Sequence, residues 1–427
     1  MNKQWTCAAA CGLGVLLAGS LWMQAENPPA AKDPKSSPGA AANRPSPKPL
    51  SGNVERGLAW LAKNQLDNGA WAQGEESSHM GGSLSGIKDT PNVADTCMVV
   101  MALFRSGNTP RAGEYCGQVL KGVKFICAQV EESDSTSLSI TSLKGTRTQM
   151  KLGTYIDTFM VAQVLAEMKD QMGDEATAKR VEAALAKVVK KIEANQRQDG
   201  RWANEGWAPT LAQAQASKAL NIAAQKGMKV DEKVRERAES SARAEFQGKA
   251  VRGVAAKSGG DAGVGLYSAG AQIAAMQGSE NTNATEREQL RKIIASPSSQ
   301  PAQVAMAKEK LDRYDANASD LRAAQSGVIA KMDDKQFMAG FGSNGGEEFL
   351  SYLNIGESLF LKGGPDWEKW DKSITGNLTR IQNQDGSWTG HHCITGRTFC
   401  TAAAVMVLTI DRSPAPAAGK IQEAKNK

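Results

Sequence analysis

The chain has 427 residues, of which 41% are hydrophobic and 5% aromatic, and its formal net charge is +6 at pH 7. Abundant Ala, Lys, Gln and Glu suit a helical protein in which small residues let helices pack closely. The positive charge is spread along the chain without a basic cluster that carries interleaved aromatic residues, so we expect no nucleic-acid partner.

The N-terminal segment predicts export. Lys3 precedes an apolar stretch that ends near Trp22, and residues 23–25 resemble a small-x-small cleavage site. We therefore expect residues 1–25 to be a signal peptide and the mature protein to be periplasmic or secreted. The alternative is an uncleaved N-terminus, in which residues 5–24 tether the protein to the inner membrane.

Composition also suggests the domain boundaries. Residues 26–50 are rich in Pro, Ala, Ser and Lys, which predicts a disordered linker. Repeated helical patterns fill residues 51–412, which favours one large domain over two. Residues 413–427 are predicted to be a disordered tail.

Three copies of a short motif, Gln-x3-Gly-x-Trp, each follow a helix-like apolar run. Glycine can adopt the left-handed turn that ends a helix, the Gln amide can bond backbone groups freed there, and the indole can stack over the turn. Three chance helix ends are the alternative. The copies are Gln65/Gly69/Trp71, Gln196/Gly200/Trp202 and Gln382/Gly386/Trp388.

A second repeat consists of apolar helical segments that align without gaps at residues 95–103, 157–165 and 400–408. Weaker relatives end near Leu220, Ala275 and Leu359. Six such inner helices, each paired with an outer helix, predict six αα-hairpins.

Together these patterns resemble the repeat of the squalene cyclase and protein prenyltransferase families, over roughly residues 53–410. The resemblance implies an all-α fold in which six hairpins close into an α6/α6 toroid with inner and outer helix rings. An open superhelical array is the alternative, because repetition alone does not establish closure. Residues 279–336 interrupt the repeat and are expected to be an outer helix with an excursion.

The resemblance also locates the acid that a bacterial squalene cyclase uses to protonate an alkene, within an Asp-x-Asp-Asp motif. Here that motif reads Asn92-Val93-Ala94-Asp95, so Ala94 stands at the acid position. A one-residue slip would place Asp95 on the acid of the eukaryotic-type cyclases, but it spoils the helix match. The inner segments also offer few aromatic faces for carbocations. Squalene cyclisation is therefore not expected, and whether the protein is an enzyme stays open.

The prenyltransferases suggest a metal site instead. Their zinc is held by Asp-x-Cys and by a His on a neighbouring helix, and Asp95 and Cys97 reproduce that spacing. His391 or His392 could complete the set if the first and last hairpins touch. We expect no cofactor, and zinc bound by these residues is the alternative. In the simpler interpretation, Asp95 and Asp157 each cap the start of their own helix, and the histidines lie in a loop.

Glu347 and Glu348 are a further candidate pair. Paired carboxylates do acid–base work in saccharide-cleaving enzymes on related toroids, although acids after a glycine turn also stabilise helix N-termini. All three histidines, His79, His391 and His392, follow a Gln-x3-Gly-x-Trp turn.

The sequence thus predicts an exported toroid protein that binds an isoprenoid, peptide or glycan ligand in its central cavity. The alternatives are a divergent, metal-dependent enzyme of the terpene cyclase/prenyltransferase class and a glycan-active toroid enzyme. A deep apolar funnel would favour an isoprenoid, whereas a polar groove would favour a peptide or glycan.

Overall fold

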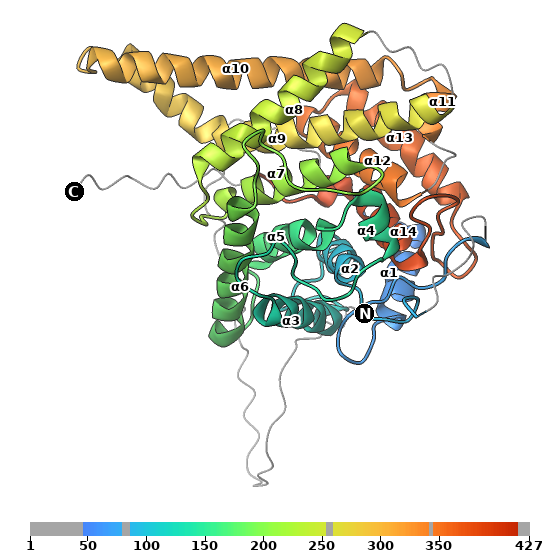
Figure 1. The fold of residues 1–427 in the computed structure, drawn as a ribbon. Coiled ribbons are helices and arrows are strands. Elements are labelled where there is room, and N and C mark those ends of the chain that lie inside the picture. Colours follow the sequence, from blue (N-terminus) through green and yellow to red (C-terminus); the bar gives the residue numbers. More distant parts are fainter. Residues whose placement is uncertain (1–45, 79–85, 253–258, 341–344, 417–427) are drawn as a thin grey trace, which may run out of the picture.

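The computed structural model describes residues 46–78, 86–252, 259–340 and 345–416. Within these ranges the regular structure is helical, apart from one isolated bridge between Trp71 and Asn92. The predicted all-α class is therefore confirmed. The helices, shown in Figure 1, are α1 (Gly52–Lys63), α2 (Val93–Arg105), α3 (Cys116–Glu132), α4 (Arg147–Leu152), α5 (Ile156–Met168), α6 (Glu175–Ala194), α7 (Pro209–Gln225), α8 (Glu232–Arg252), α9 (Gly259–Ala295), α10 (Pro301–Ile329), α11 (Lys335–Ala339), α12 (Gly346–Lys362), α13 (Pro365–Arg380) and α14 (Arg397–Leu408).

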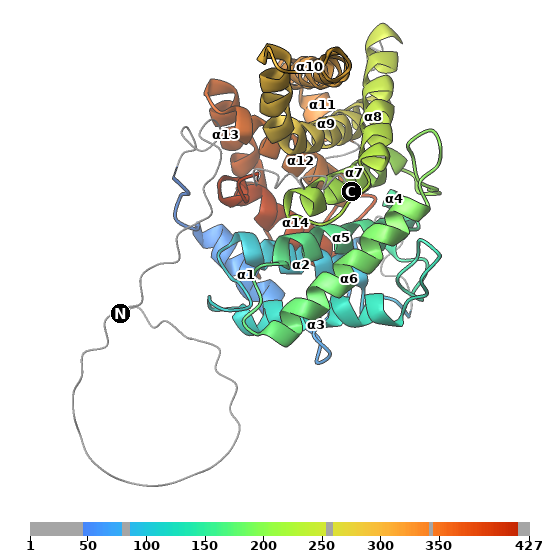
Figure 2. The ribbon, with the colours of Figure 1, turned by 90° about the vertical axis from the view of Figure 1, so that its left-hand side faces the viewer.

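One set of helices forms the interior of the molecule (Figure 2). Every residue of α5 is buried, and α2, α12 and α14 are buried along nearly their whole length, as expected for helices that are apolar on all sides. These inner helices pack in the order α2, α5, α7, α9, α12 and α14, and α14 packs on α2 again.

A second set of helices covers them and buries only one face. Helix α6 shows the reason: Val181, Leu185, Val188 and Ile192 recur at helical spacing and are buried, while the charged residues between them mostly face outward. Asp174 caps this helix by accepting a hydrogen bond from the backbone N–H of Thr177. In the described ranges α1, α3, α6, α8, α10 and α13 take this outer position.

The three repeated turns share one geometry. Each indole Nε1 donates to a carbonyl in the last turn of the preceding outer helix: Trp71 to Leu61 at 2.7 Å, Trp202 to Ile192 at 2.7 Å and Trp388 to Leu378 at 2.8 Å. The freed helix-end carbonyl is thus taken by the tryptophan and not, as the sequence suggested, by the glutamine. The indole reaches it because the turn brings the ring back over the end of the helix.

The glycines of these turns do not end the helices, which corrects the expectation from the sequence. Helix α1 ends at Lys63 with Asn64 as its C-cap, and α13 ends at Arg380 with Ile381 as its C-cap. The glycine lies further on and closes a separate tight turn with its backbone N–H. The bonds run from Gly69 to the Leu66 carbonyl at 2.9 Å, from Gly200 to Arg197 at 3.0 Å and from Gly386 to Asn383 at 3.0 Å.

Glycine is required at these positions for two reasons. The backbone is left-handed there, with φ 88° at Gly69, 81° at Gly200 and 91° at Gly386. The turn also presses against another outer helix, so that an added Cβ would collide with a backbone carbonyl. The Cβ would lie 2.6 Å from the oxygen of Lys121 on α3 for Gly69, 2.1 Å from that of Arg237 on α8 for Gly200, and 2.7 Å from that of Arg56 on α1 for Gly386.

The glutamine of each turn connects two outer helices. Its amide donates to the carbonyl of the glycine in its own turn and to a carbonyl in the first turns of another outer helix. The second acceptors are Gln118 of α3 for Gln65, Val234 of α8 for Gln196, and Asn53 of α1 for Gln382. The last of these bonds joins residues 329 positions apart.

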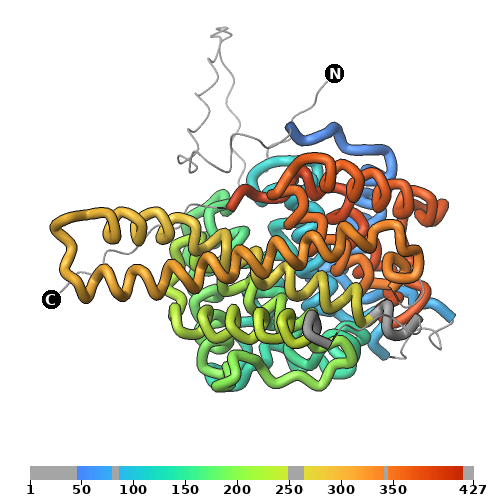
Figure 3. The backbone as a smooth tube through the Cα atoms, turned by 90° about the horizontal axis from the view of Figure 1, so that it is seen from above, coloured from blue at the N-terminus to red at the C-terminus, as the bar shows by residue number. Residues whose placement is uncertain are grey.

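Residues 279–336 contain a helical arm, whereas the later part of α10, with Leu321, Ala324 and Val328, packs on the main core. Helix α9 runs without a break to Ala295, and α10 returns along it from Pro301. The two helices extend past the other helices as a hairpin (Figure 3). Leu290, Ala307 and Tyr314 form a small apolar cluster of their own in this arm, separate from the main core.

The predicted signal peptide at residues 1–25 and most of the predicted linker at 26–50 lie outside the described residues, as does the predicted tail beyond residue 416. Among the described helices, none is long and apolar enough to cross a membrane.

Candidate functional site

The acids singled out in the sequence lie at the N-terminal ends of the inner helices. Asp95 is in the first turn of α2, and Glu347 and Glu348 are in the first turn of α12, and all three are buried. Asp95 is not the N-cap of its helix, as one interpretation held. Asn92 has that role, since its side chain accepts from the backbone N–H of Asp95 at 3.2 Å.

Asp157 also differs from its expected role. Its Oδ1 accepts from the backbone N–H of Ala94 at 3.1 Å, so it caps the neighbouring helix α2 and not its own helix α5. Its Oδ2 accepts from Gln149 of α4 at 2.8 Å. Burial raises the pKa of Asp157. This aspartate therefore holds together three helix N-termini.

Asp95 has the most unusual environment of the candidates. Neither carboxylate oxygen has a hydrogen-bond partner of normal geometry. Burial, followed by the nearby acids Asp157 and Glu76, raises the pKa of Asp95 to about 8. The side chain is thus a neutral carboxylic acid at pH 7.

Glu347 and Glu348 tie α12 to its neighbours. Glu348 accepts from the hydroxyl of Tyr267 on α9 and, at 3.0 Å, from the backbone N–H of Gly345. Glu347 accepts from the backbone N–H of Ile394 at 3.0 Å. Burial, and then the charge of Glu348, raise the pKa of Glu347 to about 8. Both side chains therefore contribute to the packing of the helix start.

The histidine loop lies before α14. His391 is exposed and His392 is partly buried, while Cys393 is buried in a left-handed conformation with φ 64°. The Cys393 Sγ lies 3.7 Å from the His392 Nε2. Burial lowers the pKa of His392 and raises that of Cys393 to about 12, so the thiol is protonated at neutral pH. His79 lies outside the described residues.

The proposed zinc ligands do not meet. In the described part of the chain, no group of three or more His, Cys, Asp or Glu side chains could hold a metal ion. Residues two apart on a helix point in different directions, so Asp95 and Cys97 do not share a face of α2. Cys97 instead lines an interior void with Met98.

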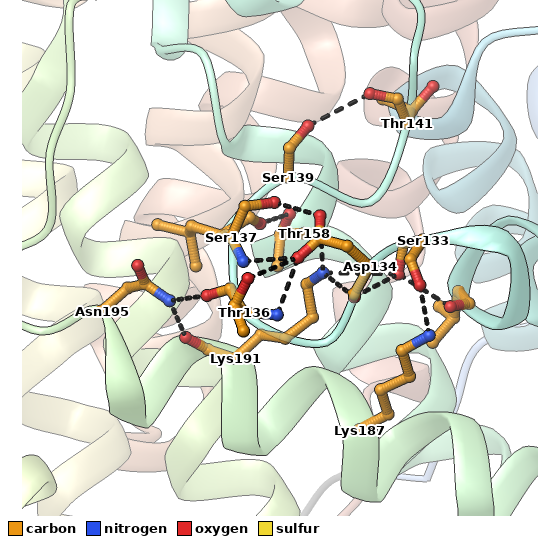
Figure 4. Close-up of polar contacts among 12 residues, drawn as sticks. Ser133, Asp134, Thr136, Ser137, Ser139, Thr141, Thr158, Lys187, Lys191 and Asn195 are labelled. Carbon is orange, nitrogen blue, oxygen red and sulfur yellow. Dashed lines mark hydrogen bonds and ion pairs between the residues drawn. The ribbon is translucent and has the colours of Figure 1, made fainter.

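A separate polar cluster fixes the connection between α3 and α4 (Figure 4). Lys191 of α6 donates to the carbonyl of Asp134 at 2.5 Å, and Lys187 donates to that of Ser133 at 2.5 Å. The Asp134 carboxylate accepts from the backbone N–H groups of Thr136 and Ser137, and hydrogen bonds from these two residues hold its pKa well below the usual range. Because these bonds stay within the chain, we interpret the cluster as structural.

The opposite end of the inner helices carries a charged pocket that sequence reasoning did not find. Its volume is about 100 Å³, and its walls come from α2, α5, α7, α9 and α12. Arg105 forms an ion pair with Glu357, and Lys218 lies 2.5 Å from the other carboxylate oxygen of Glu357. Although burial opposes the charge, these two cations hold the pKa of Glu357 at about 2.

Two polar atoms of the pocket residues are buried without a partner. They are the Nε of Arg105 and the Oε2 of Glu167, whose other oxygen accepts from Gln163 at 3.0 Å. A buried polar atom without a hydrogen bond costs about 1–3 kcal/mol. Both atoms are covered by protein, so a ligand in the pocket would reach them only if neighbouring side chains moved.

The end of the described chain forms one wall of this pocket. Residues 413–416 read Ser-Pro-Ala-Pro and carry no helix. The Ser413 hydroxyl accepts from the guanidinium of Arg105 at 3.2 Å. A segment of peptide thus already lies against the charged residues.

A small void lies between the inner helices. A void of about 20 Å³ lies between α2, α5, α7, α12 and α14, and it shares Arg105, Lys218 and Asn354 with the charged pocket. Pockets that enclose drug-sized ligands measure about 300–1,000 Å³. This void is too small for an isoprenoid chain.

The sequence did contain a signal for the charged pocket. Lys218 and Glu357 are charged residues inside otherwise apolar or small-residue inner segments, where burial of an unpaired charge is costly. Such residues need partners from other inner helices. That argument identifies the residues but not which of them pair.

No protein-family model matches the chain, and no curated protein is significantly similar to it. The described residues define an all-α protein of stacked helical hairpins with a charged pocket at one end of its inner helices. Its relation to the squalene cyclase and prenyltransferase repeat stays a prediction.

Proposed function

We propose that the protein is an exported α6/α6 toroid of the squalene cyclase/prenyltransferase repeat type. The cyclic packing order of the inner helices, which returns from α14 to α2, supports closure. So do the Gln382–Asn53 bond and the hydrogen bonds from Arg397 and Thr398 of α14 to backbone carbonyls of residues 75 and 73.

Its function is ligand binding and not triterpene cyclisation. Ala94 cannot donate a proton, and it is buried at the position where the family resemblance expects the acid. Glu347 and Glu348 are engaged in backbone contacts at a helix start, which does not favour glycan cleavage. The small size of the void between the inner helices argues against an isoprenoid.

The ligand is an extended peptide segment, bound in the charged pocket at the C-terminal ends of the inner helices. The observation that carries this proposal is the Ser-Pro-Ala-Pro segment at 413–416, which lies along the pocket with Arg105 donating to Ser413. Proline-containing segments are pre-ordered in extended form and lose little entropy on docking. The lining contains no aromatic side chain on which a sugar ring could stack.

Peptide binding tests this function. The probe is a fluorescein-labelled peptide with the sequence of residues 411–420, titrated by anisotropy into the full chain and into a chain that ends at Arg412. We expect the shortened chain to bind the peptide and the full chain to bind it at least about tenfold more weakly, because the tethered segment competes at high effective concentration.

The substitution Glu167→Gln gives a matched comparison, because it removes a charge from the pocket while it preserves shape. It should change the affinity of the shortened chain, whereas Glu368→Gln, at an exposed position on α13, should not. Equal binding by all four proteins, or none by any, would refute the assignment.

A further inference from the structure

The side-chain amide of Asn354 on α12 is an unused hydrogen-bonding group in the wall of the charged pocket. The residue is 9% exposed and lines both this pocket and the small void beside it. Its amide forms no hydrogen bond with any residue in the described ranges. Its two polar atoms are nevertheless not among the partnerless atoms that protein covers completely. A ligand in the pocket can therefore reach this amide, which both accepts and donates hydrogen bonds.

Other buried amides in the described helices are engaged within the protein. Asn221 of α7 donates to the carbonyl of Ser217 at 2.9 Å, and Asn317 of α10 donates to that of Met276 at 3.0 Å. Buried polar side chains in native proteins nearly always have a hydrogen-bond partner. Asn354 departs from this rule at the wall of a pocket, which indicates a partner from outside the protein.

Two further amides, from α9, lie in the same wall. Gln277 donates to the Oδ1 of Asn281 at 2.8 Å and accepts from the hydroxyl of Ser358 at 2.8 Å. The Nδ2 of Asn281 bonds to no described residue and is a second unused donor. A peptide group carries one N–H donor and one C=O acceptor, so side-chain amides complement it.

The charges in the wall are largely compensated. Arg105 and Lys218 both pair with Glu357. Glu167 adds a second negative charge that acts on Arg105. The remaining cation is Lys226, which is partly exposed at the C-cap of α7. A charged ligand group would have to compete with the buried pairs, whereas a neutral peptide group leaves them in place.

The Ser-Pro-Ala-Pro segment of the chain does not use the Asn354 amide. Its hydrogen bond from the pocket wall comes from Arg105, and among the described residues none comes from Asn354. Pro414 and Pro416 also have no backbone N–H to donate. A ligand with an N–H at the place of either proline can form a bond that this segment cannot.

We propose that Asn354 binds the main chain of the ligand peptide, with its Oδ1 accepting from the N–H and its Nδ2 donating to the C=O of a non-prolyl, uncharged residue. The inference rests on the proposed peptide-binding function and adds the kind of peptide that the pocket selects. The Ser-Pro-Ala-Pro segment is then a weaker occupant that such a peptide displaces.

Peptides that differ in one main-chain group test the proposal on the full chain. The parent is the labelled 411–420 peptide with Pro414→Ala and Pro416→Ala, and two further peptides each replace one of the two new N–H groups by an ester oxygen. Anisotropy titrations give the three Kd values. One ester should bind about 2–10-fold more weakly than the parent, as expected for one lost hydrogen bond. The chain's own segment competes equally with all three peptides, so it cancels from the ratio of their affinities.

The substitution Asn354→Leu removes the amide and keeps the number and branching of the side-chain atoms. The parent and the ester peptides should bind this variant equally, because the group that distinguishes them is gone. Gln325→Leu is the matched control, since it removes a buried amide on α10 that is bonded to Ser358 and does not line the pocket. The control should keep the ester effect of the wild type.

The outcomes separate this inference from the function on which it rests. Equal binding of the parent and both esters by the wild type, a measurement that needs no variant to fold, would refute the main-chain contact and leave peptide binding intact. Uniform weakening of all three peptides by Asn354→Leu, with the ester effect unchanged, would assign Asn354 a structural role and contradict the proposal. If the wild type bound neither these peptides nor the unmodified 411–420 peptide, the peptide-binding function would be wrong and the inference with it.

Discussion

Asp95 shows how one buried group changes the response of the whole protein to pH. Its folded pKa of about 8 lies well above the ordinary aspartate value of 3.8. The folded state therefore holds a proton that the unfolded state has released between these two values. Stability is accordingly lost as the pH rises through this window and reaches a plateau above the folded pKa.

This environment predicts a pH-dependent effect of Asp95→Asn. Between pH 5 and pH 7, Asp95 should make the unfolding free energy of the wild type fall by about 1.4 kcal/mol per pH unit. The variant should lack this fall. Urea denaturation at a series of pH values measures the slope. Asp174→Asn is the control, because hydrogen bonds lower the pKa of Asp174 and its contribution changes only below this window. Parallel curves for wild type and Asp95→Asn would mean that Asp95 is charged in the folded protein.

Residue roles were harder to predict than residue positions. The sequence indicated that Asp95 and Asp157 lie at helix starts, and they do. It could not show that Asn92 caps α2 or that Asp157 reaches across to Ala94, because both depend on the exact helix start and on its neighbour. A local sequence pattern does not predict which residues of two different helices contact each other.

At the level of the element, the repeated turn explains why the helical fold could largely be predicted from the sequence. Each turn follows an outer helix and combines a glycine at positive φ with a buried tryptophan bonded to the helix end. Two of the indoles also pack against glycines of another outer helix, since a Cβ on Gly57 would lie 2.8 Å from Trp388 and one on Gly122 would lie 3.1 Å from Trp71. Local chemistry and packing therefore agree at these sites.

The role of the turn glycines was only half predictable. The positive φ of Gly69 and Gly386 was expected, but their place as helix stops was wrong, because the helices have already ended at other C-cap residues. What excludes a side chain there is the carbonyl of Lys121 or Arg56 on another outer helix. The motif itself cannot predict a contact with a distant segment of the chain.

The tryptophans should be structural. Trp71→Ala, Trp202→Ala and Trp388→Ala should each lower the unfolding free energy by roughly 3–5 kcal/mol, because each empties a large buried volume and leaves a helix-end carbonyl unbonded. Thermal and urea unfolding measure the loss. Trp207→Ala removes the same side chain from a position that is 48% exposed and should cost much less. Equal losses of unfolding free energy at all four sites would contradict the role of the three buried tryptophans in holding the turn on the helix end.

For the whole molecule, the seam between the first and last hairpins is the place where closure can be tested. Gln382 bonds the carbonyl of Asn53 and accepts from the side chains of Asn53 and Arg56, all on α1. No short stretch of chain joins α13 to α1, whereas α6 and α8, bridged by Gln196, are connected through α7.

Gln382→Ala should therefore open the seam. Hydrogen exchange in α1 and α13 is expected to speed up by about tenfold or more, in line with the loss of hydrogen bonds worth about 0.5–1.5 kcal/mol each. Gln196→Ala should affect α6 and α8 less. If both variants exchanged alike, the seam would be no weaker than an ordinary hairpin contact.

The charged pocket was missed for a reason that applies to the whole molecule. Arg105, Glu167, Lys218 and Glu357 lie far apart in the sequence and meet only because the inner helices run side by side. The repeat predicts the helices, but which of their buried charges face one another follows from how the inner helices pack.

The helical arm, finally, has a bearing on how the chain can change in length. Leu290, Ala307 and Tyr314 form an apolar cluster within the arm that is separate from the main core. Lys310 and Arg313 of the arm pair with Glu232 and Glu236 of α8, so whole helical turns could be inserted or deleted on both helices of the arm only beyond these ion pairs without moving an inner helix. Among related sequences, this hairpin is where we expect insertions and deletions to accumulate.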